Sequence, residues 1–143
     1  MQNRMKVLID TNVIIDALTS RKPWSESAEQ IFIMSANHMM DMYITASSAT
    51  DIYYLVRKYL HGTDQAKQVM EKLYSFIGIL TVSGAECIDA LASAVSDYED
   101  AVVERVSVKA DMDFIITRNV KDYQQGMVKA ISPDDFIVLM RDT

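Results

Sequence analysis

The chain has 143 residues, half of them hydrophobic, one cysteine and a formal net charge of −6. This length fits a single domain, residues 1–143, that buries its own core, and one cysteine excludes an internal disulfide. No apolar stretch is long enough for a signal peptide or a membrane span, so we expect a cytoplasmic protein with no membrane partner. The acidic balance argues against a surface built for general nucleic-acid binding, which is normally basic.

Short apolar runs rich in β-branched residues recur along the chain and predict buried strands. They lie at residues 6–9, 42–46, 79–82 and 114–117, with a weaker candidate at 128–131. One or two helical segments separate each run from the next. Uniformly apolar strands that alternate with helices predict an α/β fold, with three α/β/α layers around a central parallel sheet of about five strands.

Helical periodicity fills the segments between the predicted strands. It is clearest over 66–77, where apolar residues recur at spacings of three and four. A similar pattern over 88–95 follows Ser83 and Glu86, which have the spacing of a capping box, and we expect Cys87 to be buried beside it. Other helix starts are indicated by two serine-led pairs: Ser96 with Glu99, and Ser132 with Pro133.

Ligands of a parallel sheet bind beyond the carboxyl ends of its strands, so acids that follow a strand are candidate functional residues. Asp10 ends the first predicted strand. Asp51 lies early in the helix after the second strand, which we expect Ser47 or Ser48 to cap. The alternative interpretations are a helix cap for Asp10 and a surface acid that compensates the helix dipole for Asp51. Acids before the fourth strand or elsewhere on helices are set aside: Asp89, Asp111, Asp113, Asp134 and Asp135.

Two more acids, Asp97 and Asp100, lie three residues apart where a helix opens after residue 95. With Ser96 as the cap, Asp97 would be the first helical residue, which suits dipole compensation or a supporting contact. Asp100 precedes apolar residues at the buried edge and is the favoured ligand of the two.

The fourth predicted strand leads into Thr117, Asn119 and Asp122, at the same edge of the sheet. Carboxylates gathered from separate elements repel one another unless a cation neutralises them, and oxygen ligands suit hard ions such as Mg²⁺ or Mn²⁺. The two histidines lack the spacing of zinc ligands, and no glycine-rich loop follows the first strand, which argues against a nucleotide cofactor.

Three segments resemble PIN domains in order and spacing: Leu-Ile-Asp-Thr-Asn-Val-Ile-Ile-Asp, Ser-Asp-Tyr-Glu-Asp-Ala and Phe-Ile-Ile-Thr-Arg-Asn-Val-Lys-Asp-Tyr. The resemblance spans nearly the whole chain. It implies a metal-dependent endoribonuclease, and short stand-alone PIN domains are often VapC-type toxins of bacterial toxin–antitoxin pairs. An RNA substrate, an antitoxin protein and a homodimer are the partners that it implies.

Within this resemblance the family's first three acids fall on Asp10, Asp51 and Asp100, and Asn12 and Thr117 fit its supporting polar positions. The second acid is more often glutamate in the family. The side chain of Asp51 is one methylene shorter, which changes the distance between its carboxylate and a bound metal. The resemblance implies that these carboxylates hold Mg²⁺ or Mn²⁺, which polarises a phosphodiester and activates the attacking water.

The family's fourth acidic position falls on Asn119, so a fourth carboxylate is either missing or supplied by Asp122. One metal and two metals both remain open. This departure leaves room for a PIN-like binding module without turnover. A haloacid-dehalogenase-like phosphatase is a further alternative, but Asn12 stands where that class needs a second aspartate.

Two surfaces are candidates for partner binding. The apolar, methionine-rich segment over 24–42 is a candidate antitoxin groove, although such residues at helical spacing are more often core. The candidate basic patch for RNA consists of Arg57, Lys58, Lys109, Arg118 and Lys121.

Overall fold

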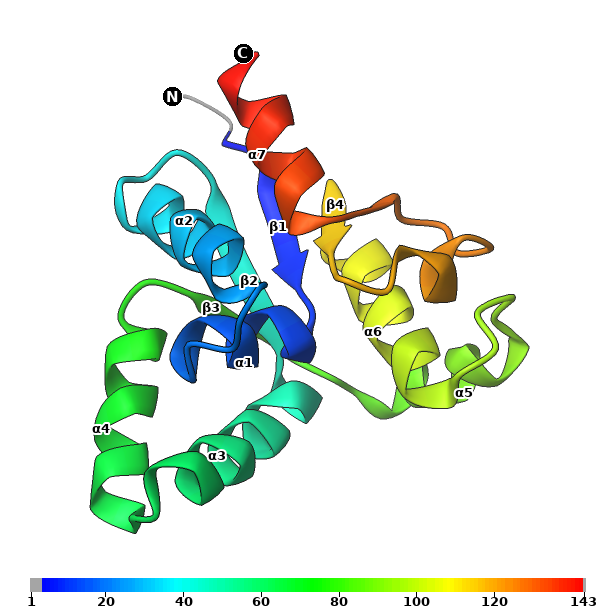
Figure 1. Ribbon diagram of the computed structural model, residues 1–143. Coiled ribbons are helices and arrows are strands. Elements are labelled where there is room, and N and C mark those ends of the chain that lie inside the picture. The colour runs from blue at the N-terminus through cyan, green and yellow to red at the C-terminus, as the bar shows by residue number, and fades with distance from the viewer. Residues whose placement is uncertain (1–3, 143) are drawn as a thin grey trace.

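The structure is a computed structural model that describes residues 4–142. Its centre is a five-stranded sheet in which every neighbouring pair is parallel (Figure 1). The spatial order β3-β2-β1-β4-β5 puts β1 in the middle, because the strand that follows β3 in sequence pairs on the far side of β1. The strands are β1 (Lys6–Ile9), β2 (Asp41–Thr45), β3 (Gly78–Leu80), β4 (Phe114–Ile116) and β5 (Ala130–Ile131).

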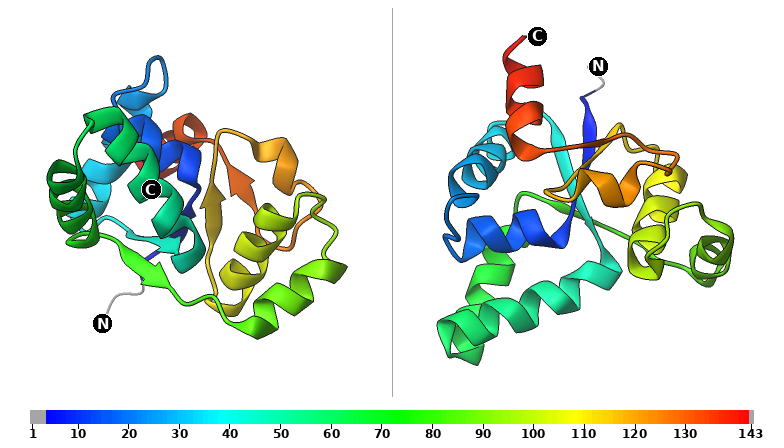
Figure 2. Two further views of the ribbon diagram at one scale, coloured as in Figure 1. Left: turned by 90° about the horizontal axis from the view of Figure 1, so that it is seen from below. Right: turned by 45° about the vertical axis from the view of Figure 1, so that its right-hand side comes forward.

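Helices cover both faces of the sheet, which confirms the predicted three-layer α/β/α fold (Figure 2). One face packs against α1 (Thr11–Leu18), α2 (Ser25–Ala36), α3 (Ala46–Leu60), α4 (Thr63–Tyr74) and α7 (Pro133–Arg141). The other face packs against α6 (Tyr98–Lys109), with α5 (Gly84–Asp89) and the short 3₁₀ turns η1 (Ala90–Ala92) and η2 (Val120–Tyr123) on that side. No helix along residues 4–142 has the length and apolar character that crossing a membrane requires.

Alternation along β1 divides the core into two layers. Val7 and Ile9 face the larger layer, whereas Leu8 packs with Ile115 and Tyr123 in the smaller one, and all five side chains are buried. Because a parallel strand is covered on both faces, each position contributes about 1.5–3 kcal/mol of burial. The continuous apolar run before Asp10 therefore fixes β1 at the centre of the sheet.

The predicted strands are all present, β1 with the predicted boundaries and the others with boundaries displaced by at most two residues. The strand predicted over 42–46 is β2 at 41–45, and the helix predicted over 66–77 is α4 at 63–74. The last helix begins as predicted, since the Ser132 side chain accepts from the Asp135 backbone and a proline follows at the first helical position.

The segment over 84–95 differs from the prediction. Its Ser83–Glu86 capping box is present, but the helix stops at Asp89 and a single 3₁₀ turn follows. Ile88 and Leu91 are 69% and 77% exposed, and Cys87 is only half-buried, so the expectation of a buried cysteine on an apolar face was wrong. The reason is geometric: α5 and η1 pack against α6 and each other rather than against the sheet.

Candidate active site

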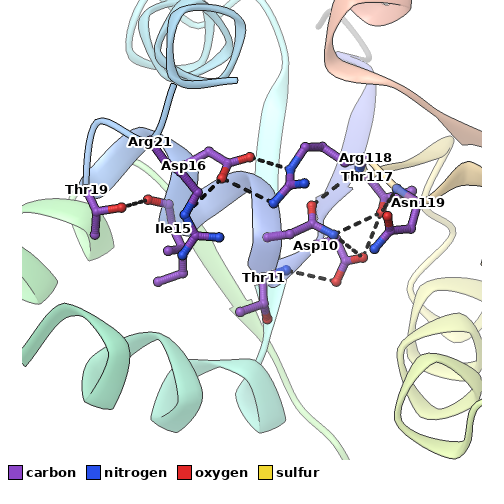
Figure 3. A network of polar contacts seen from close by, with 10 residues as sticks. Asp10, Thr11, Ile15, Asp16, Thr19, Arg21, Thr117, Arg118 and Asn119 are labelled. Carbon is purple, nitrogen blue, oxygen red and sulfur yellow. Dashed lines mark hydrogen bonds and ion pairs between the residues drawn. The ribbon is translucent and has the colours of Figure 1, made fainter. Parts of the chain in front are cut away.

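Asp10 leaves the carboxyl end of the central strand and caps α1. Its Oδ1 accepts a hydrogen bond from the Thr11 backbone at 2.9 Å, and its Oδ2 accepts one from the Thr117 hydroxyl at 2.8 Å (Figure 3). The cap interpretation is confirmed, and the cap holds the carboxylate at the edge of the sheet. Burial raises the pKa of Asp10 despite these two hydrogen bonds, and nearby Asp122 raises it further.

Thr117 is fully buried and joins β4 to this carboxylate. Its Oγ1 donates to Asp10, accepts from the Asn119 backbone at 3.0 Å and lies 3.5 Å from the Asn12 amide. The Asn12 amide also reaches Asp10 at 3.4 Å, and its carbonyl oxygen accepts from the Arg118 backbone. Thr117 and Asn12 thus both contact the Asp10 carboxylate and each other.

The start of α6 brings a second carboxylate to the site. Asp97 is the N-cap, with its side chain accepting from the Asp100 backbone at 3.0 Å, so the prediction of Ser96 as cap and Asp97 as first helical residue was wrong. Asp100 accepts a hydrogen bond from the buried Tyr123 hydroxyl at 3.2 Å. Burial, followed by repulsion from Asp10 and Asp97, raises the pKa of Asp100 from 3.8 to about 6.

Asp51 reaches the same place from α3. Its helix is capped by Thr45, whose hydroxyl accepts from the Ser48 backbone, rather than by either predicted serine. Asp51 is exposed and shares a hydrogen bond with Glu99, and this contact is the main reason that the pKa of Glu99 is raised. Two adjacent carboxyl groups repel one another when both are ionised.

These acids line one open pocket of about 440 Å³, which we call the acidic pocket. Its lining includes four carboxyl groups and no lysine, arginine or histidine. Hydroxyl, apolar and aromatic groups complete it. The lining residues are Asp10, Thr11, Ser47, Ser48, Asp51, Tyr54, Leu55, Glu99, Asp100 and Val103.

The two candidates for a fourth acidic position lie apart. Asp122, on η2, is close enough to Asp10 and Asp100 to raise the pKa of both carboxyl groups, although it is not part of the pocket lining. Asn119 lines a different pocket beside Trp24, and it is the Asn119 backbone that contacts the site, through Thr117. Asp122 is therefore the candidate whose charge acts on the other acids.

One further acid beside the site has a different environment. Asp16, on α1, is 1% exposed and pairs with Arg118, whose Nε lies 2.6 Å from Oδ2, and with Arg21 at 3.7 Å (Figure 3). The Arg118 guanidinium also lies 4.0 Å from the centre of the Trp24 ring. This network fixes the loop after β4, because the same arginine follows Thr117 in sequence.

Sequence reasoning overlooked Glu99 and the Asp16–Arg118 pair. Glu99 was assigned only a capping role, although it adjoins Asp100 at the start of α6, and this adjacency was the available signal. Asp16 and Arg118 are 102 residues apart, and no local pattern links them.

The donor set of the acidic pocket suits a hard divalent cation, since its ligands are carboxylate oxygens that repel one another. Within residues 4–142, however, no group of three or more His, Cys, Asp or Glu side chains stands in positions that would together hold a metal ion. The ligand types fit Mg²⁺ or Mn²⁺, whereas the side-chain positions are not closed around an ion. Asp51 and Glu99, both exposed, are the members with most freedom to rotate.

The fold and the pocket together define a parallel α/β domain with acids gathered at the carboxyl edge of its central strands. The family model for the PIN domain matches residues 6–121, which include every acid that lines the acidic pocket and end one residue before Asp122. The chain therefore belongs to the PIN-domain family.

Solved structures share the fold at low sequence identity. A toxin–antitoxin complex from Klebsiella pneumoniae has a chain that is 21% identical, with a TM-score of 0.67, over 89% of this chain and 97% of that one. A chain of VapBC2 from Rickettsia felis, solved with a promoter DNA fragment, is 14% identical with a TM-score of 0.66, over 90% of this chain and 98% of that one. VapC20 of Mycobacterium tuberculosis, described as a sarcin–ricin loop cleaving toxin, is 12% identical with a TM-score of 0.59, over 76% of this chain and 86% of that one. No curated protein sequence matches the chain.

Proposed function

We propose that this PIN domain is an endoribonuclease that cuts RNA with Mg²⁺ or Mn²⁺ held by Asp10, Asp51, Asp100 and Asp122. The observation that carries the proposal is the acidic pocket, which gathers four carboxyl groups from the end of β1, from α3 and from α6, with no cationic side chain in its lining. Such a site is costly to the fold unless an external cation enters it. Glu99 joins the proposed ligand set because it shares the pocket and contacts Asp51.

The protein's own groups orient the carboxylates. Thr11 and Thr117 hold Asp10 from two sides, and Tyr123 holds Asp100 through its hydroxyl. The exposed Asp51 side chain would rotate to join Asp10 and Asp100 as a metal ligand. A bound metal ion would supply polarisation of the phosphate and a lowered pKa for the attacking water. The aspartates act mainly as its scaffold.

Membership of the PIN family and the solved relatives support RNA as the substrate and a toxin–antitoxin pair as the setting. One of those structures is described as a toxin–antitoxin complex, one as VapBC2 bound to promoter DNA, and one as a sarcin–ricin loop cleaving toxin. An antitoxin protein is accordingly the proposed macromolecular partner. The phosphatase alternative is disfavoured because Asn12, in place of a second aspartate, donates its amide to Asp10 and has no acid proton to give.

The proposal is tested by titrating Mg²⁺ and Mn²⁺ into the purified protein by calorimetry and incubating the same samples with a panel of single-stranded RNAs. Asp10→Asn is expected to lose both metal binding and cleavage. Asp111→Asn is the matched control, because it makes the same change on an exposed turn at the opposite end of the sheet.

Metal-dependent cleavage that persists in Asp10→Asn would contradict the proposed site. Metal binding without cleavage of any RNA would identify a binding module that lacks turnover. Absence of metal binding in the unaltered protein would remove the basis of the proposal altogether.

A further inference from the structure

A second open pocket, of about 560 Å³, adjoins the acidic pocket at the junction of α3 and α4. We call it the basic pocket, because its lining includes two cations and a histidine but no carboxyl group. Tyr54 belongs to the lining of both pockets, so the two adjoin at this side chain. The lining residues are Tyr54, Arg57, Lys58, His61, Gly62 and Thr63.

The two cations of this pocket are free to bind a ligand. Arg57 and Lys58 are exposed in the last turn of α3, and neither forms an ion pair within residues 4–142. Two other members of the predicted basic patch are already paired, Lys109 with Glu86 and Arg118 with Asp16. Of the three members that form no ion pair within residues 4–142, Arg57 and Lys58 line the basic pocket and Lys121 lines neither pocket, in a chain whose net charge is −6.

The spacing along α3 sets the distance between the two pockets. Asp51, Tyr54 and Lys58 follow one another at intervals of three and four residues, so they lie on one face of the helix. Seven residues at 1.5 Å each give about 10 Å from the acidic pocket to the cations. Between them the Tyr54 side chain is 61% exposed and stands edge-on to Tyr53.

We propose that the basic pocket binds backbone phosphates of single-stranded RNA on one side of the bond that is cut, with Tyr54 as the surface on which an intervening base stacks. This inference rests on the proposed function and assigns the path of the substrate. Cations that follow the backbone beside an exposed aromatic ring are the elements of single-strand binding. An acidic peptide would use the cations but would not need the ring at the mouth of the acidic pocket, so we favour RNA.

The first test measures binding of a labelled 12-nucleotide RNA by fluorescence anisotropy, in an Asp10→Asn background that prevents cleavage. The double change Arg57→Gln/Lys58→Gln is expected to raise Kd roughly tenfold at 0.1–0.2 M salt and to reduce the slope of log K against log salt by about 1.4. Lys6→Gln/Lys129→Gln is the matched control, because it removes the same charge from exposed positions that line neither pocket. Circular dichroism verifies that each variant is folded.

The second test separates the aromatic ring from the charge. Tyr54→Ala is expected to raise Kd about tenfold without changing the salt slope, since stacking does not release counterions. Tyr59→Ala is the matched control, because Tyr59 is 53% exposed on the same helix but lines neither pocket.

Equal losses in test and control variants, or no RNA binding by the parent, would overturn the inference. An unchanged RNA affinity alongside binding of an acidic peptide would overturn it in favour of a protein partner. Cleavage assays distinguish this failure from failure of the proposed function. In the active protein, Arg57→Gln/Lys58→Gln is expected to raise KM roughly tenfold and leave kcat unchanged. If nothing is cleaved but the binding contrast persists, the nuclease proposal fails and the RNA-binding surface stands.

Discussion

Asp10, the N-cap of α1, and Asp16, six residues later within that helix, have different electrostatic environments. Asp16 is buried and pairs with two arginines, whereas Asp10 receives hydrogen bonds only from neutral groups. The chain thus provides cations for a carboxylate that supports the fold and provides none in the pocket that we assign to function. The contrast suggests that the presence or absence of an internal counter-ion is a better guide to a site than acidity itself.

The largest effect is expected when the paired acid is changed. Asp16→Asn leaves the Arg118 guanidinium without its anionic partner and should lower the free energy of unfolding by about 3 kcal/mol. The same change at Asp10 should lower it little or raise it, because burial already opposes the charge there. Urea unfolding of both variants at pH 7 measures the difference. Equal destabilisation by the two changes would remove the contrast.

Metal ions should distinguish the acids of the acidic pocket from the paired Asp16. Mg²⁺ at ten times its Kd is expected to stabilise the unaltered protein by about 1.4 kcal/mol through binding to the folded state alone. Asp51→Asn should abolish this stabilisation by Mg²⁺. Asp16→Asn should retain it, although its free energy of unfolding without Mg²⁺ is lower. Thermal unfolding with and without Mg²⁺ measures both, and the idea fails if Asp51→Asn gains as much as the parent.

The acidic pocket should also give stability a particular pH dependence. The pKa of Asp100 is about 6 in the folded protein against an ordinary value of 3.8, so folding favours the protonated form. The stability that this group contributes is complete below about pH 4 and is lost as the pH rises through 6. Asp100→Asn should therefore be more stable than the parent at pH 7, by about 1 kcal/mol once solvent screening is allowed for, and no more stable at pH 4. A variant that is less stable at pH 7 would contradict this.

The smallest effect is expected from the hydroxyl that orients Asp100. Tyr123→Phe removes a hydrogen bond that lowers the pKa of this carboxyl group, so its pKa should rise further. The acidic limb of the pH–rate profile should move to higher pH, with a stability loss of about 1 kcal/mol. Tyr98→Phe, which removes a hydroxyl bonded to the Cys87 carbonyl, should leave the profile in place.

Local pattern was sufficient for the sheet and for the acids that directly follow strands. A continuous apolar run identified β1, and the carboxyl-end rule then selected Asp10. Pattern was insufficient where tertiary packing decides. The apolar periodicity over 88–95 suggested a buried helix, yet α5 lies at the periphery, and Ile88 and Leu91 are exposed there.

Helix caps and long-range pairs were the other sources of error. Ser96 and Asp97 are both good caps, and only the backbone geometry shows that Asp97 has that role. The Asp16–Arg118 ion pair could not be predicted, because it joins α1 to the loop after β4 through folding alone. Asp122 and Asn119 are near neighbours in sequence, and the direction of η2 separates them.

The position of β1 in the middle of the sheet has a consequence for the newly made chain. Its partner on one side, β2, is synthesised early, but its partner on the other, β4, comes after residue 113. Asp10 and Asp51 are therefore synthesised well before Asp100 and Asp122. If the proposed function is correct, the growing polypeptide cannot cleave RNA until most of it has left the ribosome. The proposed antitoxin partner could bind the chain during that interval.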